Sequence, residues 1–333
     1  MNHLPAPETN IVEVAPATAE IGSSSLICLC HWQPDVQAPT VIIVHGLEGS
    51  ANSQYVIGNA NKLWTAGYSV VRMNMRNCGD SRYWGGEQAR GSLDRAALDP
   101  DSICPTLYHS GLSGDVRAVA RHFVKTRGVS RIAILGYSMG GNMVLKLAGE
   151  LGDDSMPESY APEIRACVAV SPAADLSASA GALHRPINRV YERRFLRALE
   201  RHYLHKVSLY PERYSAARAY NLNSIREFDE HITAFYSGFR GAEDYYTRSS
   251  ASQFAAKISI PTLVLHALDD PFIRILPQTC DALRANPNVS LIETRHGGHC
   301  AFLADADPAT SDDGYWAEQT ALRFLLSLPE LRP

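Results

Sequence analysis

The stretch Ile132-Ala-Ile-Leu-Gly-Tyr-Ser-Met-Gly-Gly-Asn142 joins a short apolar run to a Gly-x-Ser-x-Gly turn and then to a helical pattern. The run from Arg131 to Leu135 is β-branched and does not alternate, which predicts a strand covered on both faces in a parallel sheet. After the turn, apolar side chains recur at the spacing of an amphipathic helix, at Met143, Val144, Leu147 and Leu151. The pattern therefore places Ser138 at a sharp strand-to-helix reversal.

The turn around Ser138 is suited to presenting a nucleophile. Bulky side chains two positions before or after this serine would collide with the strand or the helix, and these positions are Gly136 and Gly140. Holding a non-glycine residue in such a turn costs about 1–3 kcal/mol. The amide of Met139 is left unpaired at the helix start, where it is placed to stabilise an oxyanion. A flexible Gly/Ser turn is the alternative, but the flanking strand and helix patterns favour a nucleophile elbow.

Composition is ordinary for a soluble globular protein: of 333 residues, 45% are hydrophobic and 20% are charged. The length allows one large α/β domain or two domains. A net charge of −4 predicts no general attraction to nucleic acid or to an anionic membrane. We therefore expect a small-molecule substrate.

The cellular location is predicted from what the chain lacks. Residues 1–20 hold three prolines and three glutamates without a basic start or an apolar core, so we expect no signal peptide. No run of about 18 apolar residues occurs, which predicts no stable membrane insertion. The seven cysteines are odd in number and form no Cys-x-x-Cys pair, so we expect neither a disulfide framework nor structural zinc. A reducing cytoplasm is the predicted location.

Alternating strand and helix patterns predict an α/β fold with a mostly parallel central sheet of about eight strands flanked by helices. A hairpin is predicted within 11–32, and buried strands are predicted at 40–44, 69–75, 131–135, 164–170, 261–266 and 289–293. Helical patterns are predicted at 52–66, at 113–127, after Met139 and from Gly314 onward. Residues 83–105 show weak periodicity and are predicted to form a long surface loop that covers a site or binds something.

Between Ala173 and about Ser250 the strand rhythm stops, and apolar residues recur at helical spacing. We interpret 172–250 as a helical cap inserted between two parts of the core, 1–171 and 251–333. The arginines of the cap could face an anionic head group of a ligand. The alternative is an ordinary solvent-exposed helix face, which is favoured because Glu192 and Glu200 are interleaved with the arginines. These arginines are Arg185, Arg189, Arg193, Arg194, Arg197 and Arg201. Its aromatic residues either line an acyl pocket or pack the cap onto the core; they are Phe228, Phe235, Tyr236, Phe239, Tyr245 and Tyr246.

The loop His45-Gly-Leu-Glu-Gly-Ser50 directly follows a predicted central strand, the position where open α/β sheets place their ligands. In a serine hydrolase it would supply the second oxyanion donor, for which we select the amide of Leu47. A phosphate-cradling loop is the alternative, but both glycine-rich phosphate motifs are missing. His45 is expected to orient the loop rather than to transfer protons.

An acid and a base are predicted after later strands. Asp269 and Asp270 follow the strand at 261–266, while Asp175 and Asp80 are weaker candidates for the acid. His299 follows the last strand after two glycines, which let it turn back toward Ser138. His296 and His299 are three apart, but without a helix or a third ligand a metal site is not favoured.

The order Ser, Asp, His in these strand contexts is the α/β-hydrolase arrangement. The combined motifs of this chain resemble those of the YheT-like hydrolases, which are bacterial relatives of the animal abhydrolase-domain lipases. The motifs that carry the resemblance are His45–Ser50, Met73–Arg76, Leu107–Gly111, Gly136–Asn142, His266–Phe272 and His296–Phe302. The resemblance implies hydrolysis of carboxylic esters without a metal or organic cofactor. It also favours Asp270 over Asp269, because the family places the acid directly before Pro271. Asn77 stands where the family commonly has glycine, a substitution that Asn tolerates at positive φ.

The implied reaction uses Ser138 as the nucleophile, His299 as the base and Asp270 as its partner, with the amides of Leu47 and Met139 as the oxyanion hole. Activity is expected to rise with pH as His299, whose ordinary pKa is about 6.5, loses its proton. We expect a small-molecule ester with a short to medium acyl chain, possibly derived from a lipid. Acyl transfer on the same residues, or ligand binding without catalysis, is the alternative.

Overall fold

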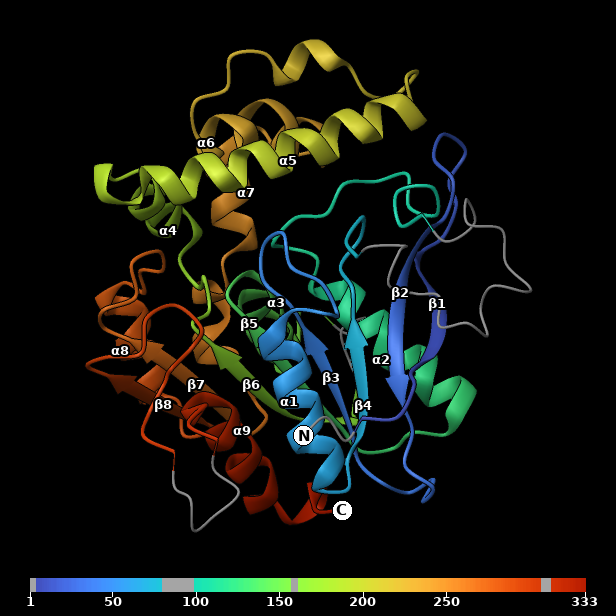
Figure 1. Ribbon diagram of the computed structural model, residues 1–333, viewed down its shortest axis with the longest axis vertical. Helices are drawn as coiled ribbons and strands as arrows, with labels where there is room; N and C mark the ends of the chain where they lie inside the picture. The colour runs from blue at the N-terminus through green and yellow to red at the C-terminus, as the bar shows by residue number, and fades with distance from the viewer. Residues whose placement is uncertain (1–3, 80–98, 157–160, 307–312) are drawn as a thin grey trace.

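A computed structural model of the chain describes residues 4–79, 99–156, 161–306 and 313–333 (Figure 1). The candidate acid Asp80 and most of the predicted loop at 83–105 lie outside the described residues. Residues 99–105 of that loop are described and contact the cap.

An eight-stranded sheet forms the centre of the molecule, in the order β1-β2-β4-β3-β5-β6-β7-β8. β2 runs antiparallel to β1 and β4, and all other neighbouring strands are parallel. The strands are β1 (Glu8–Ala15), β2 (Ser24–His31), β3 (Thr40–Val44), β4 (Ser69–Met73), β5 (Ile132–Tyr137), β6 (Ile164–Val170), β7 (Thr262–Ala267) and β8 (Val289–Thr294). The predicted α/β fold with a mostly parallel sheet is confirmed.

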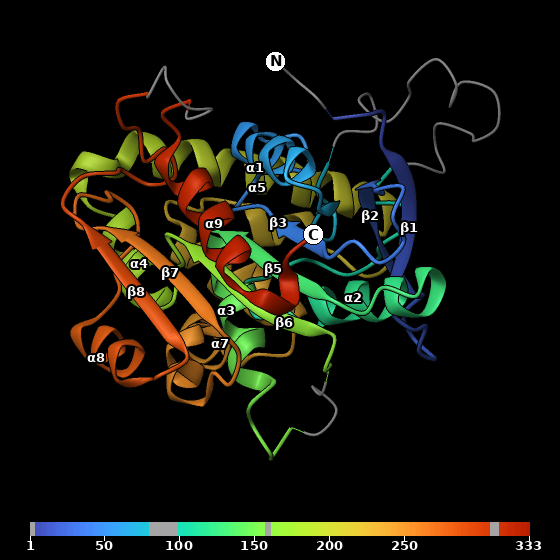
Figure 2. The same ribbon diagram turned by 90° about the horizontal axis from the view of Figure 1, so that it is seen from below.

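Helices cover both faces of the sheet, which explains why β3, β4, β5 and β7 are buried along their whole length (Figure 2). One face packs against α1 (Gln54–Thr65) and α9 (Trp316–Ser327). The other packs against α2 (Ser113–Arg127), α3 (Met139–Glu150) and α8 (Pro277–Ala285). Helix α8 was not predicted, although Pro277 at its first position is a typical helix-start residue.

Residues 172–250 form helices above the carboxyl ends of the parallel strands (Figure 1). The segment has its own apolar clusters, centred on Tyr203 and on Tyr245. The division into core, cap and core at residues 171 and 250 stays a prediction. The helices of this segment are α4 (Leu176–Leu183), α5 (Arg189–Leu209), α6 (Ile225–Phe228) and α7 (Ala242–Ser249), with a π-helical turn at Asp229–Ala234 and short 3-10 turns at Pro186–Asn188 and Ala216–Ala219. Two further 3-10 turns follow later in the chain, at Ala251–Lys257 and Pro329–Leu331.

The junction of β5 and α3 is too close for side chains at two of its glycines. A Cβ on Gly136 would overlap the carbonyl oxygen of Gly140. A Cβ on Gly140 would overlap backbone oxygens at the end of β3 and the start of the following loop. These contacts fix how closely the central strand approaches the helix that follows it.

Replacing Gly136 by Ala is expected to lower the free energy of unfolding by about 1–3 kcal/mol or more, because the backbone must shift to admit the methyl group. The measurement is urea denaturation followed by circular dichroism. Gly181→Ala in α4 is the matched control, because its Cβ would meet no atom within 4 Å. It should raise stability by roughly 0.5–1 kcal/mol. Equal effects of the two substitutions would contradict the role assigned to the junction.

Candidate active site

Ser138 lies between the last residue of β5 and the first residue of α3, with φ 56° and ψ −117°. A non-glycine residue with this positive φ is strained. The turn places the Ser138 hydroxyl within hydrogen-bonding distance of His299. The geometry is that predicted from the Gly-x-Ser-x-Gly motif.

A continuous chain of hydrogen bonds links three side chains that are far apart in sequence. His299 Nε2 lies 3.0 Å from Ser138 Oγ, and His299 Nδ1 lies 2.9 Å from Asp270 Oδ2. Asp270 is 1% exposed, and its second oxygen accepts hydrogen bonds from the amides of Phe272 and Ile273 at 2.8 and 3.0 Å. A buried carboxylate needs such partners, so these amides hold Asp270 charged and oriented toward the imidazole.

The other candidate acids make different contacts. Asp269 accepts from the amide of Gly298 at 2.9 Å and lies 3.4 Å from the exposed His296 ring. Asp175 accepts from the amide of Leu276 and from the hydroxyl of Thr279. Asp269 therefore holds the turn that carries His299, and Asp270 alone of the two neighbouring acids contacts the imidazole.

The electrostatic surroundings of His299 favour its charged form. Burial opposes protonation, but Cys300 and the hydrogen-bonded Asp270 carboxylate outweigh it and raise the pKa of His299 above its ordinary value. For Asp270, burial acts in the opposite direction, yet the bonds from His299 and from two amides lower the carboxyl pKa. The rise of activity with pH that accompanies loss of the His299 proton is therefore expected above the ordinary pKa of about 6.5.

The loop after β3 lies directly against the serine. A Cβ on Gly46 would stand 3.1 Å from the Cβ of Ser138. Among the hydrogen bonds of the described residues, none is donated by the amides of Leu47 and Met139, and both residues line the same pocket as Ser138. The two predicted oxyanion donors therefore remain available to a ligand.

His45 holds this loop from inside the protein. It is fully buried, its Nε2 accepts from the amide of Met75 at 3.0 Å, and its Nδ1 lies 2.7 Å from the carbonyl of Gly46. Burial lowers the pKa of His45 to about 4, so the ring is neutral and donates through Nδ1. The hydroxyl of Tyr55 accepts a further bond from the Gly46 amide at 2.9 Å.

Glu48, in the same loop, has a role that sequence analysis missed. Its φ is 55°, and its carboxylate accepts from the Tyr108 hydroxyl at 2.6 Å. The other carboxylate oxygen lies 3.2 Å from Nδ1 of His202 on α5. Glu48, which directly follows Leu47, thus connects this loop to the cap through His202 and to the segment before α2 through Tyr108. The sequence shows Glu48 within the motif, but neither partner is near it in the chain.

A largely apolar pocket opens beside Ser138 between the sheet edge and the cap, and it encloses about 980 Å³ including solvent at its mouth. Its apolar wall includes Leu176, Leu183, Leu199, Ile225 and Ile273. The aromatic residues of the cap lie in different places. Phe228, Tyr245 and Tyr246 line this pocket, whereas the side chain of Phe235 is 55% exposed.

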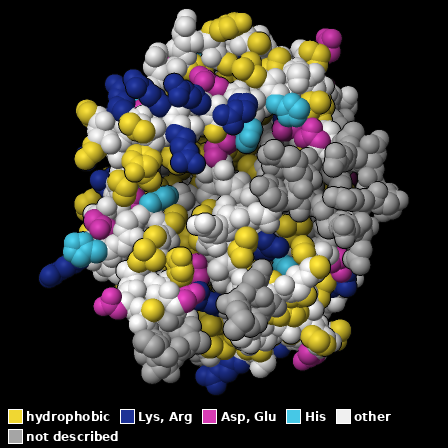
Figure 3. All heavy atoms as spheres, in the orientation of Figure 1, with side chains coloured by type: hydrophobic (Ala, Val, Ile, Leu, Met, Phe, Trp, Pro, Cys, Tyr) yellow, Lys and Arg dark blue, Asp and Glu magenta, His cyan; other side chains and the backbone are white. Residues whose placement is uncertain are grey.

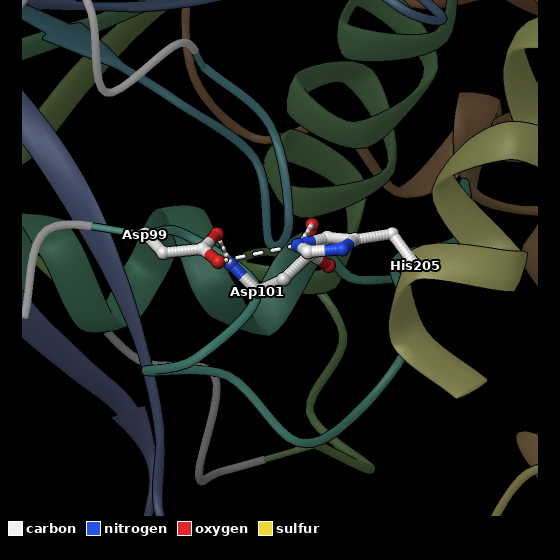
Figure 4. A group of neighbouring side chains, drawn as sticks. All are labelled: Asp99, Asp101 and His205. Atoms are coloured by element: carbon white, nitrogen blue, oxygen red, sulfur yellow. Dashed lines mark hydrogen bonds and ion pairs between the residues drawn. The ribbon is translucent and has the colours of Figure 1, made fainter. Parts of the chain in front are cut away.

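One group of side chains in the described part of the chain has metal-ligand chemistry, Asp99, Asp101 and His205 (Figure 4). His205 Nε2 lies 3.2 Å from Asp99 Oδ2 and 3.9 Å from Asp101 Oδ2. However, the buried ammonium of Lys206 lies 3.0 Å from Asp101 Oδ1 and already supplies a positive charge there. The group is therefore explained as an ion-pair network that attaches α5 to residues 99–104.

A family model of the alpha/beta hydrolase fold matches residues 39–306. The chain belongs to the α/β-hydrolase family. It is 34% identical to "Putative esterase YheT" of Escherichia coli (strain K12), over 80% of this chain and 71% of that protein. This agrees with the predicted YheT-like resemblance.

More distant relatives agree with this membership. Phospholipase ABHD3 of Mus musculus is 26% identical over 84% of this chain, which spans only 60% of that protein. The solved structure of the Pyrococcus furiosus esterase Pf2001 shares the fold, with a TM-score of 0.52 and 15% identity over 96% of this chain and 93% of the other. These names agree with the predicted carboxylic ester hydrolase. Among the described residues, no helix is both long and apolar enough to span a bilayer.

The acid limb of kcat/KM against pH is expected above pH 6.5, because only neutral His299 accepts a proton and its pKa is raised. Cys300→Ala removes one of the groups that raise this pKa, so the limb should move to lower pH. The measurement is kcat/KM for a soluble ester across pH. Cys280→Ala should leave the pH profile in place, because Cys280 is not one of the groups that raise this pKa. If kcat/KM of the wild type instead rose with pH below pH 6.5, the raised pKa assigned to His299 would be wrong.

Glu48→Ala is expected to lower kcat about ten- to a hundredfold with little change in KM. The reason is that a displaced Leu47 amide would form a weaker hydrogen bond to the oxyanion of the transition state and would affect substrate binding little. Tyr108→Phe should act through the same contact, so the double variant should lose less than the product of the single effects. Glu13→Ala, an exposed acid on β1, is the control. If the loss of kcat in the double variant equalled the product of the two single losses, Glu48 and Tyr108 would not act through a shared contact.

Proposed function

We propose that this chain is a serine hydrolase of carboxylic esters, with Ser138 as the nucleophile. The supporting observation is the unbroken series of bonds from the Ser138 hydroxyl through both nitrogens of His299 to the buried Asp270. Membership of the α/β-hydrolase family and the names of the relatives agree with this reaction class.

In the proposed reaction, the Ser138 hydroxyl attacks the ester carbonyl while His299 Nε2 accepts its proton. Asp270 keeps the Nδ1 proton directed toward itself and stabilises the imidazolium that forms. The carbonyl oxygen becomes negative and accepts bonds from the amides of Leu47 and Met139. His299 then protonates the leaving alcohol, and water, activated by the same imidazole, releases the acyl group.

The substrate is proposed to be an ester with a short to medium acyl chain, including lipid-derived esters. The apolar wall formed by α4, α5 and α6 supports this choice, because it offers the acyl chain a dry surface next to Ser138. We also infer a cytoplasmic location, which is supported by the odd number of cysteines, all of them free thiols.

Ser138→Ala should lower kcat for a p-nitrophenyl ester by at least roughly a thousandfold, because it removes the hydroxyl that is bonded to His299 and forms the acyl-enzyme. Ser110→Ala is the comparison, because Ser110 is a buried pocket serine whose hydroxyl accepts a hydrogen bond from Asn142. A fluorophosphonate probe should label the wild type and the Ser110 variant but not the Ser138 variant.

Wild-type protein that is folded but resists the probe would instead support a ligand-binding protein without catalysis. Acyl transfer would appear as a new ester product, with faster release of p-nitrophenol, when an alcohol is added.

A further inference from the structure

The outward face of α5 carries a group of five arginines. Arg189, Arg193, Arg194, Arg197 and Arg201 are all exposed, and within the described ranges none of them forms an ion pair. Four of the five, with Val190, line one shallow hollow on the surface. Figure 3 shows the resulting concentration of Lys and Arg side chains across the upper part of the molecule, where α5 runs in Figure 1.

The acids interleaved with these arginines neutralise the face only in part. Glu192 is 1% exposed and points inward, where its carboxylate lies 3.1 Å from His184 Nδ1 and accepts from the amide of Ile225. Glu200 is partly buried at the edge of the group, beside Arg197. The interpretation of this helix as an ordinary solvated face depended on both acids, and the fold removes Glu192 from the surface.

Apolar side chains accompany the arginines. Ile187 is 84% exposed, Val190 is 76% exposed and Leu204 is 46% exposed, and Val190 and Leu204 lie on the arginine-bearing side of α5. The opposite side of the same helix is buried through Leu196, Leu199 and Tyr203. A helix with basic and apolar side chains together on one exposed face is typical of binding in the interface of a bilayer.

We propose that the outward face of α5 docks the protein on an anionic phospholipid bilayer. Lipid phosphates would neutralise the five arginines, while Val190, Leu204 and the preceding Ile187 enter the head-group region. The net charge of −4 does not oppose this, because the arginines are grouped within a few turns of helix and act within a Debye length of the surface. Docking does not depend on hydrolysis, although the buried side of α5 lines the pocket beside Ser138.

The test is sedimentation of the full chain with vesicles of phosphatidylcholine alone or with about one-third phosphatidylglycerol. At low salt the wild type should bind the anionic vesicles and not the neutral ones, and about 0.5 M salt should release it. The variant R193Q/R197Q should bind roughly 30-fold more weakly, from about 1 kcal/mol for each basic residue. R165Q/R332Q, which removes the same charge from exposed positions elsewhere, should bind like the wild type.

Equal binding of wild type to both vesicle types, or equal loss in the two double variants, would overturn the proposal. Binding to a short DNA duplex as tight as to the anionic vesicles would also overturn it, because the surface would then recognise any polyanion. Turnover of a soluble ester by R193Q/R197Q should equal that of the wild type. This readout separates failure of docking from failure of the proposed hydrolase function.

Discussion

The backbone turn at Ser138 is the constraint on which the rest of the structure depends. Its positive φ stores strain that a free chain would relax, so the surroundings must hold it. Gly136 and Gly140 permit the close approach of strand and helix, and Asn142 secures the helix that follows. The Asn142 amide group donates to the carbonyls of Ser110 and Ser249 and accepts from the amide of Ala251. One side chain therefore joins α3 to the segment before α2 and to the end of the cap.

The parallel sheet brings Ser138 together with the other residues of the site. Strands β3, β5 and β7 are parallel, so the segments after them emerge at one edge, where the loop after β3, Ser138 and Asp270 meet. The cost of burying the Asp270 carboxylate is offset by two amides and by the imidazole, which in turn becomes more basic. The same contacts that make the acid tolerable in the interior orient His299 toward the serine.

The cap helix α5 relates the pocket to the surface because its sides have different chemistry. Leu199 and Tyr203 face the pocket, His202 reaches Glu48 in the loop after β3, and the arginines face outward. Lys206 fixes this arrangement from within: its ammonium, 1% exposed, donates to the carbonyls of Asp101 and Cys104 and pairs with the Asp101 carboxylate. A buried charge with this many partners resists displacement, so the position of α5 over the pocket is set by polar contacts as well as by apolar packing.

The sequence by itself determined the strands, most of the core helices and the turn at Ser138, because these depend on near neighbours through hydrophobic period and glycine placement. The resemblance also placed Asn77 where the family commonly has glycine, and the structure shows this residue at a positive φ of 62°. The residues alone left Asp269 and Asp270 both open, and the family resemblance favoured Asp270, the residue that contacts His299 in the structure. Only the tertiary structure decided that Glu48 contacts Tyr108 and His202. Side chains from distant segments meet according to strand direction, loop path and helix rotation. These are properties of the whole packed chain, and no local pattern encodes them.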